Sequence, residues 1–392
     1  MKYDFTSIPD RSNCGSQKWN AVKDASVENV PLSVADMEFY TAPPIKEAIK
    51  KLADTAILGY TNATDEYYEA VCGWMKRRHG FDVKKEWIIN TPGVVDALAV
   101  LVDAVTKPCD SVIILTPVYY PFDMSVIAKG RRIIYSTLIN NNGHYEIDYS
   151  DLREKAAMPK AKALLFCNPH NPVGRVWTKE ELSKVADICC DNDVFIIDDE
   201  IHHDLIMPGY EHTVMATVSE RVKNNIAVCT APSKTFNIAG LGLSNIFIPN
   251  LDIKKAVEQE ISRASIEASN VIALDACKAA YAYGENWLDE LLEYLDGNVA
   301  LVRSFLKENL PQVRLMEPDG TYLIWLDFSA LGLDSDALDD FLIQKAKVWL
   351  NKGTMFGDGG ECCFRMNLGS PRHVVLKALE QIKEAVDTLL IK

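Results

Sequence analysis

The sequence predicts an α/β protein whose larger domain is built on a mostly parallel sheet. Short apolar runs alternate with amphipathic helical segments through the middle of the chain. These runs are apolar at nearly every position, which is typical of strands covered by helices on both faces. The composition then changes near residue 285, where a long helical segment leads into a separate C-terminal part. We therefore expect a large domain followed by a smaller α+β domain.

The strands of the large domain are marked by runs rich in Val, Ile and Leu. They are expected at residues 112–115, 163–166, 194–197 and 226–230. Between the second and third, Thr178 and Glu181 have the spacing of a capping box, which begins a helix. The apolar residues that follow recur at helical spacing: Leu182, Val185, Ala186 and Cys189. Such strand–helix–strand alternation predicts parallel pairing.

The C-terminal part has a different pattern. Residues 285–310 predict one long helix, and residues 314–328 predict two strands around a Pro-Asp-Gly turn. The final segment, 372–392, carries apolar residues at helical spacing: Val375, Leu379, Ile382, Val386 and Leu389. We expect three parts: an N-terminal arm (1–46) that joins the small domain, a large domain (47–285) and a small C-terminal domain (286–392).

Composition and charge exclude several classes of function. The 392 residues carry a net charge of −14, which disfavours nucleic acid and an acidic membrane surface as partners. No secretory signal is visible, and no apolar stretch is long enough to span a bilayer. The ten cysteines lack a Cys-x-x-Cys pair, so we expect reduced thiols, no bound metal and a cytoplasmic location.

Polar residues and glycine follow the predicted strands, where ligands collect in open α/β sheets. Lys234 follows the strand at 226–230, and a lysine at such a position can form a Schiff base with pyridoxal phosphate. That cofactor also needs a carboxylate at its pyridine nitrogen. Asp199 is the candidate, but Asp198 and Glu200 adjoin it, and the sequence does not decide which of the three faces the site.

Phosphate and ring contacts can be proposed from the same pattern. Gly93 precedes an apolar helical segment, so the amides of Val94 and Val95 could bind a phosphate at the start of that helix. Ser233 could add a hydroxyl, and Tyr119 could stack on the cofactor ring. Taken singly, a glycine before a helix is more often an ordinary turn, and an aromatic residue at such a position more often belongs to the core.

Several motifs together resemble one enzyme family. They are VPLSVADMEF (30–39), LGYT (58–61), TPGVV (91–95), TPVYYPF (116–122), CNPHNPVGRVWTKEEL (167–182), DDEIHHDL (198–205), APSKTFNIAGL (231–241) and FGDGGECCFRMNLGSPR (356–372). In this order they resemble the fold-type I pyridoxal phosphate enzymes, and within them the MalY/PatB-type cystathionine β-lyases, also called cysteine-S-conjugate β-lyases. The resemblance covers nearly the whole chain.

The resemblance implies roles for individual residues. Lys234 would hold pyridoxal 5'-phosphate covalently and then act as the general base, and Arg365 would grip the substrate carboxylate. The other cofactor contacts would be Asp199 at the pyridine nitrogen, Asn168 at the 3-oxygen, Tyr119 over the ring, and Val94, Val95 and Ser233 at the phosphate. Tyr60 would reach the site from a second subunit, which implies a homodimer.

Departures from related aminotransferases narrow the activity. His202 stands where aspartate aminotransferases have a tyrosine on the 3-oxygen, and Gly242 replaces a phosphate-binding arginine. Both are typical of the lyase branch, whereas Ser33 replaces its usual tryptophan and would alter the substrate pocket. The resemblance implies α,β-elimination of cystathionine or related cysteine S-conjugates to a thiol, pyruvate and ammonia. An aminotransferase and a fold-retaining regulatory protein remain the alternatives, and His170 and His203 are expected to be solvated or in loops.

Overall fold

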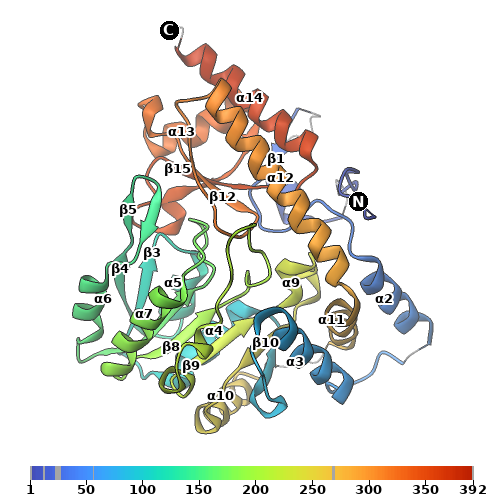
Figure 1. The fold of residues 1–392 in the computed structure, drawn as a ribbon, viewed down its shortest axis with the longest axis vertical. Coiled ribbons are helices and arrows are strands. Elements are labelled where there is room, and N and C mark those ends of the chain that lie inside the picture. Colours follow the sequence, from blue (N-terminus) through green and yellow to red (C-terminus); the bar gives the residue numbers. More distant parts are fainter. Residues whose placement is uncertain (1, 12–13, 23–27, 56, 267–269, 391–392) are drawn as a thin grey trace.

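The computed structural model describes residues 2–11, 14–22, 28–55, 57–266 and 270–390. A seven-stranded sheet with its helices forms the lower part in Figure 1, and a four-stranded sheet lies in the upper part. Helix α12 (Glu285–Asn309) runs from one part to the other, and α14 (Arg372–Leu390) packs beside it at the top. Among the described residues, no helix has the length and apolar character needed to cross a bilayer.

The large sheet confirms the predicted parallel arrangement. Its strands, in spatial order, are β2 (Ile88–Thr91), β10 (Ser244–Phe247), β9 (Ile226–Thr230), β8 (Phe195–Asp199), β7 (Ala161–Cys167), β3 (Ser111–Thr116) and β4 (Arg132–Thr137). Strand β10 is antiparallel to both of its neighbours, and the other pairs are parallel. Each predicted strand overlaps one of these, so the mostly parallel sheet expected from the apolar runs is correct.

Helices cover both faces of this sheet. Successive residues of β3 alternate between two cores, with Ile113 and Leu115 in one and Val112 and Ile114 in the other. The helices of the lower part are α2 (Pro43–Thr55), α3 (Asp65–His79), α4 (Val94–Val105), α5 (Pro121–Ile127), α6 (Tyr149–Ala156), α7 (Lys179–Asp191), α8 (Glu220–Lys223), α9 (Pro232–Thr235), α10 (Leu251–Arg263) and α11 (Val271–Tyr283). This explains why the predicted central strands are nearly apolar throughout: helices cover both of their faces, whereas the edge strand β4 is partly exposed.

The capping box at the start of α7 is confirmed. The Thr178 hydroxyl accepts a hydrogen bond from the Glu181 amide at 3.2 Å, and the Glu181 carboxylate accepts one from the Thr178 amide at 2.8 Å. These two bonds satisfy amides that have no partner within the helix. The predicted apolar face of α7, which includes Leu182 and Cys189, is buried.

The upper part combines both ends of the chain. Its sheet is ordered β11 (Arg314–Met316), β12 (Leu323–Asp327), β15 (Cys363–Asn367) and β14 (Asn351–Lys352), so the two predicted strands at 314–328 are confirmed. The short strand β1 (Val30–Pro31) pairs in parallel with β13 (Val348–Trp349). The remaining elements are α1 (Gln17–Asn20), α13 (Ser335–Phe341) and the hairpin β5 (Ile139–Asn141) and β6 (His144–Glu146), which extends from the large sheet toward this part.

Candidate active site

A cavity at the carboxyl ends of the parallel strands brings together most of the predicted site. Its lining includes these predicted residues: Val94, Val95, Tyr119, Asp199, His202, Ser233 and Lys234. They come from α4, the loop after β3, the end of β8 and the turn after β9, which meet because parallel strands end at one edge of the sheet. Residues far apart in the sequence therefore share one site.

Lys234 lies on α9, directly after β9. Its Nζ donates a hydrogen bond to the carbonyl oxygen of Ala35 at 2.7 Å, so a loop of the N-terminal arm closes over the amine. Burial lowers the pKa of Lys234 to about 8, and the charge of Arg365 adds to this, while Asp36 and Asp199 oppose it. An amine with this pKa is partly neutral near neutral pH, as a nucleophile and general base requires.

The structure selects one of the three adjacent acids. Asp199 lines the cavity, and its Oδ1 accepts a hydrogen bond from the Ile201 amide at 3.0 Å. Glu200 is directed elsewhere, where its carboxylate accepts the Met215 amide at 3.0 Å and contacts His212 at 2.9 Å. Burial raises the pKa of Asp199 to about 7. A cation placed beside this carboxylate would restore its ionised form.

The start of α4 provides an anion-binding surface on the cavity wall. Gly93 occupies the N-cap position and has no side chain to satisfy the first helical amides, so these can point at a ligand. Gly242 lies against the same turn with φ of +61°, and a Cβ on it would come within 3.0 Å of the Pro92 carbonyl oxygen. The backbone therefore requires glycine at 242, where related aminotransferases carry an arginine.

The placement of Asn168 is wrong, and Asn171 takes its position. The Asn168 side chain is fully buried away from the cavity and donates to the Thr213 carbonyl at 3.2 Å, whereas Asn171 lines the cavity. Both belong to the segment NPHNP, which repeats Asn-Pro. The second Asn-Pro is the signal in the sequence that could have pointed to Asn171, although the pattern gives no reason to prefer either asparagine.

Arg365 lies on β15 and is not part of the cavity lining, but it contacts Asn171, which is. Its guanidinium donates to Asn171 Oδ1 at 3.0 Å, to Asn351 Oδ1 at 2.7 Å and to the Ser33 carbonyl at 3.3 Å. Its Nε is buried and has no partner among the described residues. Burial lowers the pKa of Arg365 to about 10. A buried, incompletely paired guanidinium next to a cavity favours an anionic ligand.

Tyr60 does not reach the cavity of its own chain. Its side chain is fully exposed, at 105% relative exposure, and its neighbours Ile57 and Leu58 are exposed as well. A contribution of Tyr60 to the site of another subunit therefore stays a prediction.

His170 and His203 lie in loops, as one of the two expectations held, but both are fully buried rather than solvated. His203 lies with His79 around Asp204, which also accepts a hydrogen bond from the hydroxyl of Thr235 at 2.8 Å. One ligand atom from each of His79, His203 and Asp204 fits within 4.8 Å of the others, a spacing that could hold a metal ion, although hydrogen bonds to Asp204 already occupy this cluster. The cluster anchors the residue next to Lys234.

Comparison with known proteins identifies the family. The family model for aminotransferase class I and II matches residues 27–382. The chain belongs to the aminotransferase class I and II family. Among its curated relatives, cystathionine beta-lyase PatB of Bacillus subtilis (strain 168) is 40% identical over 384 residues, covering 97% of this chain and 99% of the relative.

Solved structures of similar proteins indicate the fold of this family member. Cystalysin from Treponema denticola, whose crystal structure contains a pyridoxal 5'-phosphate cofactor, is 44% identical with a TM-score of 0.97, covering 99% of this chain and all of that one. The pyridoxal phosphate-bound C-S lyase of Staphylococcus hominis is 36% identical with a TM-score of 0.92, covering 98% of each chain. The fold is therefore that of fold-type I pyridoxal phosphate enzymes, as the motifs implied.

Proposed function

We propose that this protein is a pyridoxal 5'-phosphate-dependent carbon–sulfur β-lyase. It would act on cystathionine or related cysteine S-conjugates. The observation that carries the proposal is the pair Lys234 and Asp199, a buried amine and a buried carboxylate that line one cavity. Relatives named as C-S lyases and cystathionine β-lyases along the full chain support the choice of reaction.

The residues present fit this cofactor. An aldehyde needs a lysine with a lowered pKa, and Lys234 has one. A pyridinium nitrogen needs an anionic partner, and the buried Asp199 carboxylate is available on the cavity wall. A phosphate needs free amides, which Gly93 and the first turn of α4 provide, with the Ser233 hydroxyl nearby. We propose Asn171, rather than Asn168, as the contact of the ring oxygen, because Asn171 lines the cavity.

The residues of this chain would have separate roles in the reaction. When bound, the cofactor would supply a conjugated ring that accepts the electron pair released at the substrate Cα. Lys234 would remove the Cα proton, because its lowered pKa leaves the amine able to accept it near neutral pH. Arg365 would bind the substrate carboxylate through its guanidinium, whose buried Nε has no partner among the described residues. Tyr119 would lie against the ring and exclude water from that face.

The expected net reaction is an elimination followed by hydrolysis. The Cβ–S bond breaks, the sulfur leaves as a thiol, and water converts the remaining three-carbon unit to pyruvate and ammonia. For cystathionine the thiol is homocysteine. The cavity positions of His202 and Gly242 favour this reaction over transamination, since both replace residues that related aminotransferases use to hold the cofactor.

The assembly, domain division and location complete the proposal. We propose a homodimer in which Tyr60 enters the partner's cavity, because it is fully exposed and does not line the cavity of its own chain. The division into 1–46, 47–285 and 286–392 is supported by the β1–β13 pairing and by the start of α12 at Glu285. The ten cysteines, all within the described part of the chain, are free thiols, which suits the cytoplasmic location proposed from the sequence.

Incubation with cystathionine and no keto-acid acceptor tests the function. We expect free thiol, pyruvate and ammonia in equal amounts, together with a visible absorbance band that borohydride removes. The Lys234→Ala variant should lack both. Lys254→Ala is the matched control, because Lys254 pairs with Glu258 on helix α10, and it should keep both. Turnover that requires a keto acid and releases no thiol would instead establish an aminotransferase.

A further inference from the structure

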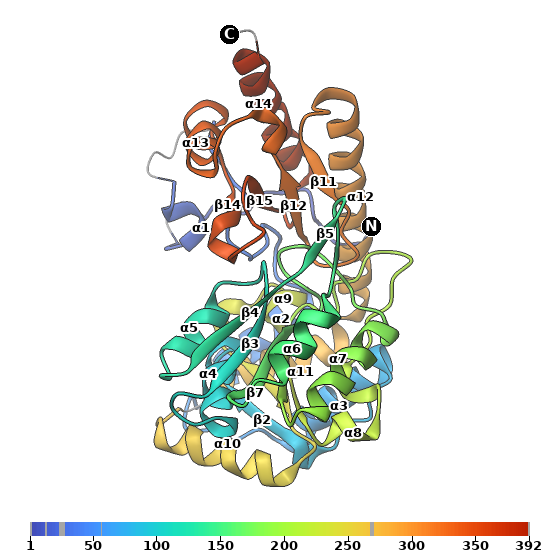
Figure 2. The same ribbon diagram turned by 90° about the vertical axis from the view of Figure 1, so that its left-hand side faces the viewer.

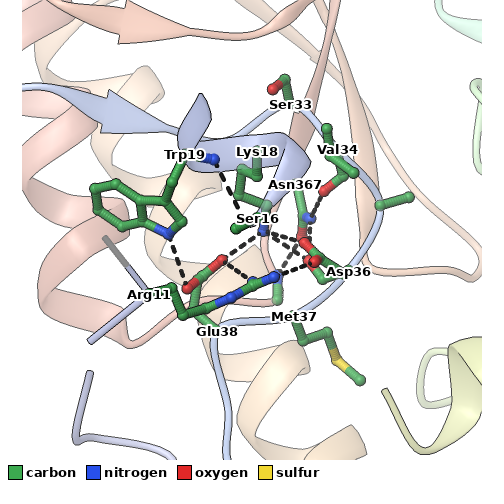
Figure 3. Close-up of polar contacts among 12 residues, drawn as sticks. Arg11, Ser16, Lys18, Trp19, Ser33, Val34, Asp36, Met37, Glu38 and Asn367 are labelled. Atoms are coloured by element: carbon green, nitrogen blue, oxygen red, sulfur yellow. Dashed lines mark hydrogen bonds and ion pairs between the residues drawn. The ribbon is translucent and has the colours of Figure 1, made fainter. Parts of the chain in front are cut away.

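Figure 3 shows four charged side chains that contact one another: Arg11, Lys18, Asp36 and Glu38. Asp36 directly follows Ala35, whose carbonyl oxygen accepts the hydrogen bond of Lys234. Lys18 is fully buried, and its Nζ lies 2.9 Å from Asp36 Oδ1 and 2.9 Å from Glu38 Oε1. Arg11 contacts the same two carboxylates, at 2.7 Å to Asp36 and 2.8 Å to Glu38. Two cations thus face two carboxylates, and such a balance is needed because an unpaired charge at this depth is costly.

This cluster fixes the backbone on either side of Ala35. Lys18 Nζ also donates to the Asp36 carbonyl at 2.7 Å. Asn367, from β15, donates to the carbonyls of Val34 and Asp36, each at 2.7 Å. With both neighbouring peptide groups held, the Ala35 carbonyl is directed at Lys234 Nζ, 2.7 Å away, and it also accepts the Tyr322 hydroxyl at 2.9 Å.

Two charges of this cluster act on the Lys234 amine: Asp36 favours the protonated form and Lys18 disfavours it. Two charges outside the cluster also act on it, since Arg365 disfavours the protonated form and Asp199 favours it. His202 also faces the amine, and burial keeps the pKa of its imidazole well below the ordinary value, so it is neutral.

Asp36 itself stays ionised. Burial raises its pKa, but the charges of Lys18 and Arg11 outweigh that effect and hold the pKa below its ordinary value. The Asp36 carboxylate therefore carries its charge near neutral pH.

We propose that Lys18 and Asp36 are positioning residues for Lys234. Their buried ion pair holds the Ala35 carbonyl against the amine and places two opposite charges beside it. Neutralising Asp36 should therefore lower the proton affinity of the Lys234 amine, and neutralising Lys18 should raise it. The relevance to catalysis rests on the proposed function, but the effect on the amine is independent of any cofactor.

The test measures the pKa of the Lys234 amine in the full chain without cofactor. Trace labelling with acetic anhydride across a pH series, followed by mass spectrometry of the peptide that contains residue 234, gives the pKa of this one amine. Asp36→Asn should lower it and Lys18→Met should raise it, each by about one pH unit, which is the usual size of a close buried charge effect. Lys18→Arg keeps the charge and should stay near the wild type.

Controls separate this electrostatic role from loss of folding. Lys352→Met removes a lysine that pairs with Asp336 at the surface, and it should not shift the labelling curve. Should Lys18→Met fail to fold, Arg11→Met provides the same sign of change with a smaller size, because Arg11 is partly exposed. Asp36→Asn removes the charge and keeps the size of the side chain, so the change it causes in the pKa of Lys234 tests the effect of the charge by itself.

Shifts of the same sign in Lys18→Met and Asp36→Asn, or no shift in Asp36→Asn, would overturn the proposal. A chain that binds no pyridoxal phosphate yet shows the two opposite shifts would contradict the proposed function and still support the positioning role. If the cofactor binds, the pH midpoint of its visible band should move in the same opposite directions in the two variants, and a midpoint that does not move would count against the role in catalysis.

Discussion

The guanidinium of Arg365 donates to the side-chain oxygen of Asn171 at 3.0 Å, across 194 residues of sequence. This bond joins the small C-terminal sheet to the loop after β7 of the large sheet. It also orients the Asn171 amide at the cavity wall, because its oxygen is occupied by Arg365 and its NH2 group remains available to a ligand. The two residues proposed to contact cofactor and substrate are thus held by each other.

Asn171→Ala should weaken cofactor binding more than Asn168→Ala does. Loss of one hydrogen bond to a charged or polar ring oxygen costs about 1.5 kcal/mol, or about tenfold in affinity. Asn168→Ala should act on the free energy of unfolding instead, because its amide bonds to the Thr213 carbonyl in the interior. Titration of the cofactor-free variants with pyridoxal phosphate and urea unfolding measure the two effects. A larger loss of pyridoxal phosphate affinity in Asn168→Ala than in Asn171→Ala would instead support Asn168 as the contact of the ring oxygen.

Arg365→Lys should raise KM for cystathionine by about 10- to 100-fold, since a hydrogen-bonded charge pair with a carboxylate contributes about 1.5–3 kcal/mol. Lysine keeps the charge, but its three donors cannot replace the three present hydrogen bonds of Arg365 and also hold a carboxylate in a bidentate contact. The visible band of the bound cofactor should stay, because Arg365 is proposed to bind the substrate. Steady-state kinetics with cystathionine check the expectation, and an unchanged KM would show that the carboxylate binds elsewhere.

The cofactor-free chain should lose stability as the pH rises from about 4 to 7, through Asp199. Burial raises the pKa of this carboxyl to about 7 from an ordinary 3.8, so across this window the folded chain holds a proton that the unfolded chain has released. Raising the pH therefore favours unfolding. Asp199→Asn cannot ionise and should exceed the wild type by about 2–4 kcal/mol in free energy of unfolding at pH 8.

Urea unfolding at pH 5, 6.5 and 8 provides the measurement for Asp199→Asn. The difference from the wild type should grow with pH. Asp191→Asn, at an exposed ion pair with Arg221, is the control and should show no such trend. A difference that is the same at all three pH values would mean that Asp199 is already ionised in the folded chain.

Gly242→Ala should cost about 1–3 kcal/mol and weaken cofactor binding, because residue 242 has φ of +61° and its new Cβ would press on Pro92, next to the proposed phosphate site. Gly240→Ala is the matched control: it lies two residues away, its φ is not positive, and nothing lies within 4 Å of the added Cβ. Thermal unfolding and pyridoxal phosphate titration compare them. Equal effects in the two variants would contradict the backbone argument.

Mixing two inactive variants tests the shared site. If Tyr60 enters the partner's cavity, a hybrid of Lys234→Ala and Tyr60→Ala chains has one site with both residues intact. With random reassociation about half of the dimers are hybrids, so about a quarter of the wild-type activity should return. Measurement after refolding the variants together checks this. No recovery, with hybrids present by mass spectrometry, would place Tyr60 at its own chain's cavity or at none.

Local patterns were sufficient for the elements that depend on near neighbours in sequence. The capping box of Thr178 and Glu181 predicted the start of α7, and the apolar runs predicted the strands of the parallel sheet, because hydrogen bonds within a few residues and burial on both faces leave a direct trace in the sequence. The motif around Lys234 likewise marked the position of the reactive amine.

The sequence by itself determined the family, the α/β architecture and the lysine around which the site is built. Only the tertiary structure decided that Asn171 rather than Asn168 meets the cavity, that Asp199 is the acid that faces it, and that Ala35 of the N-terminal arm contacts Lys234. The physical reason is that side-chain direction at a strand end, and contacts between segments some 200 residues apart, depend on packing across the whole fold. Where neighbouring residues have similar chemistry, the local sequence does not show which of them faces the cavity.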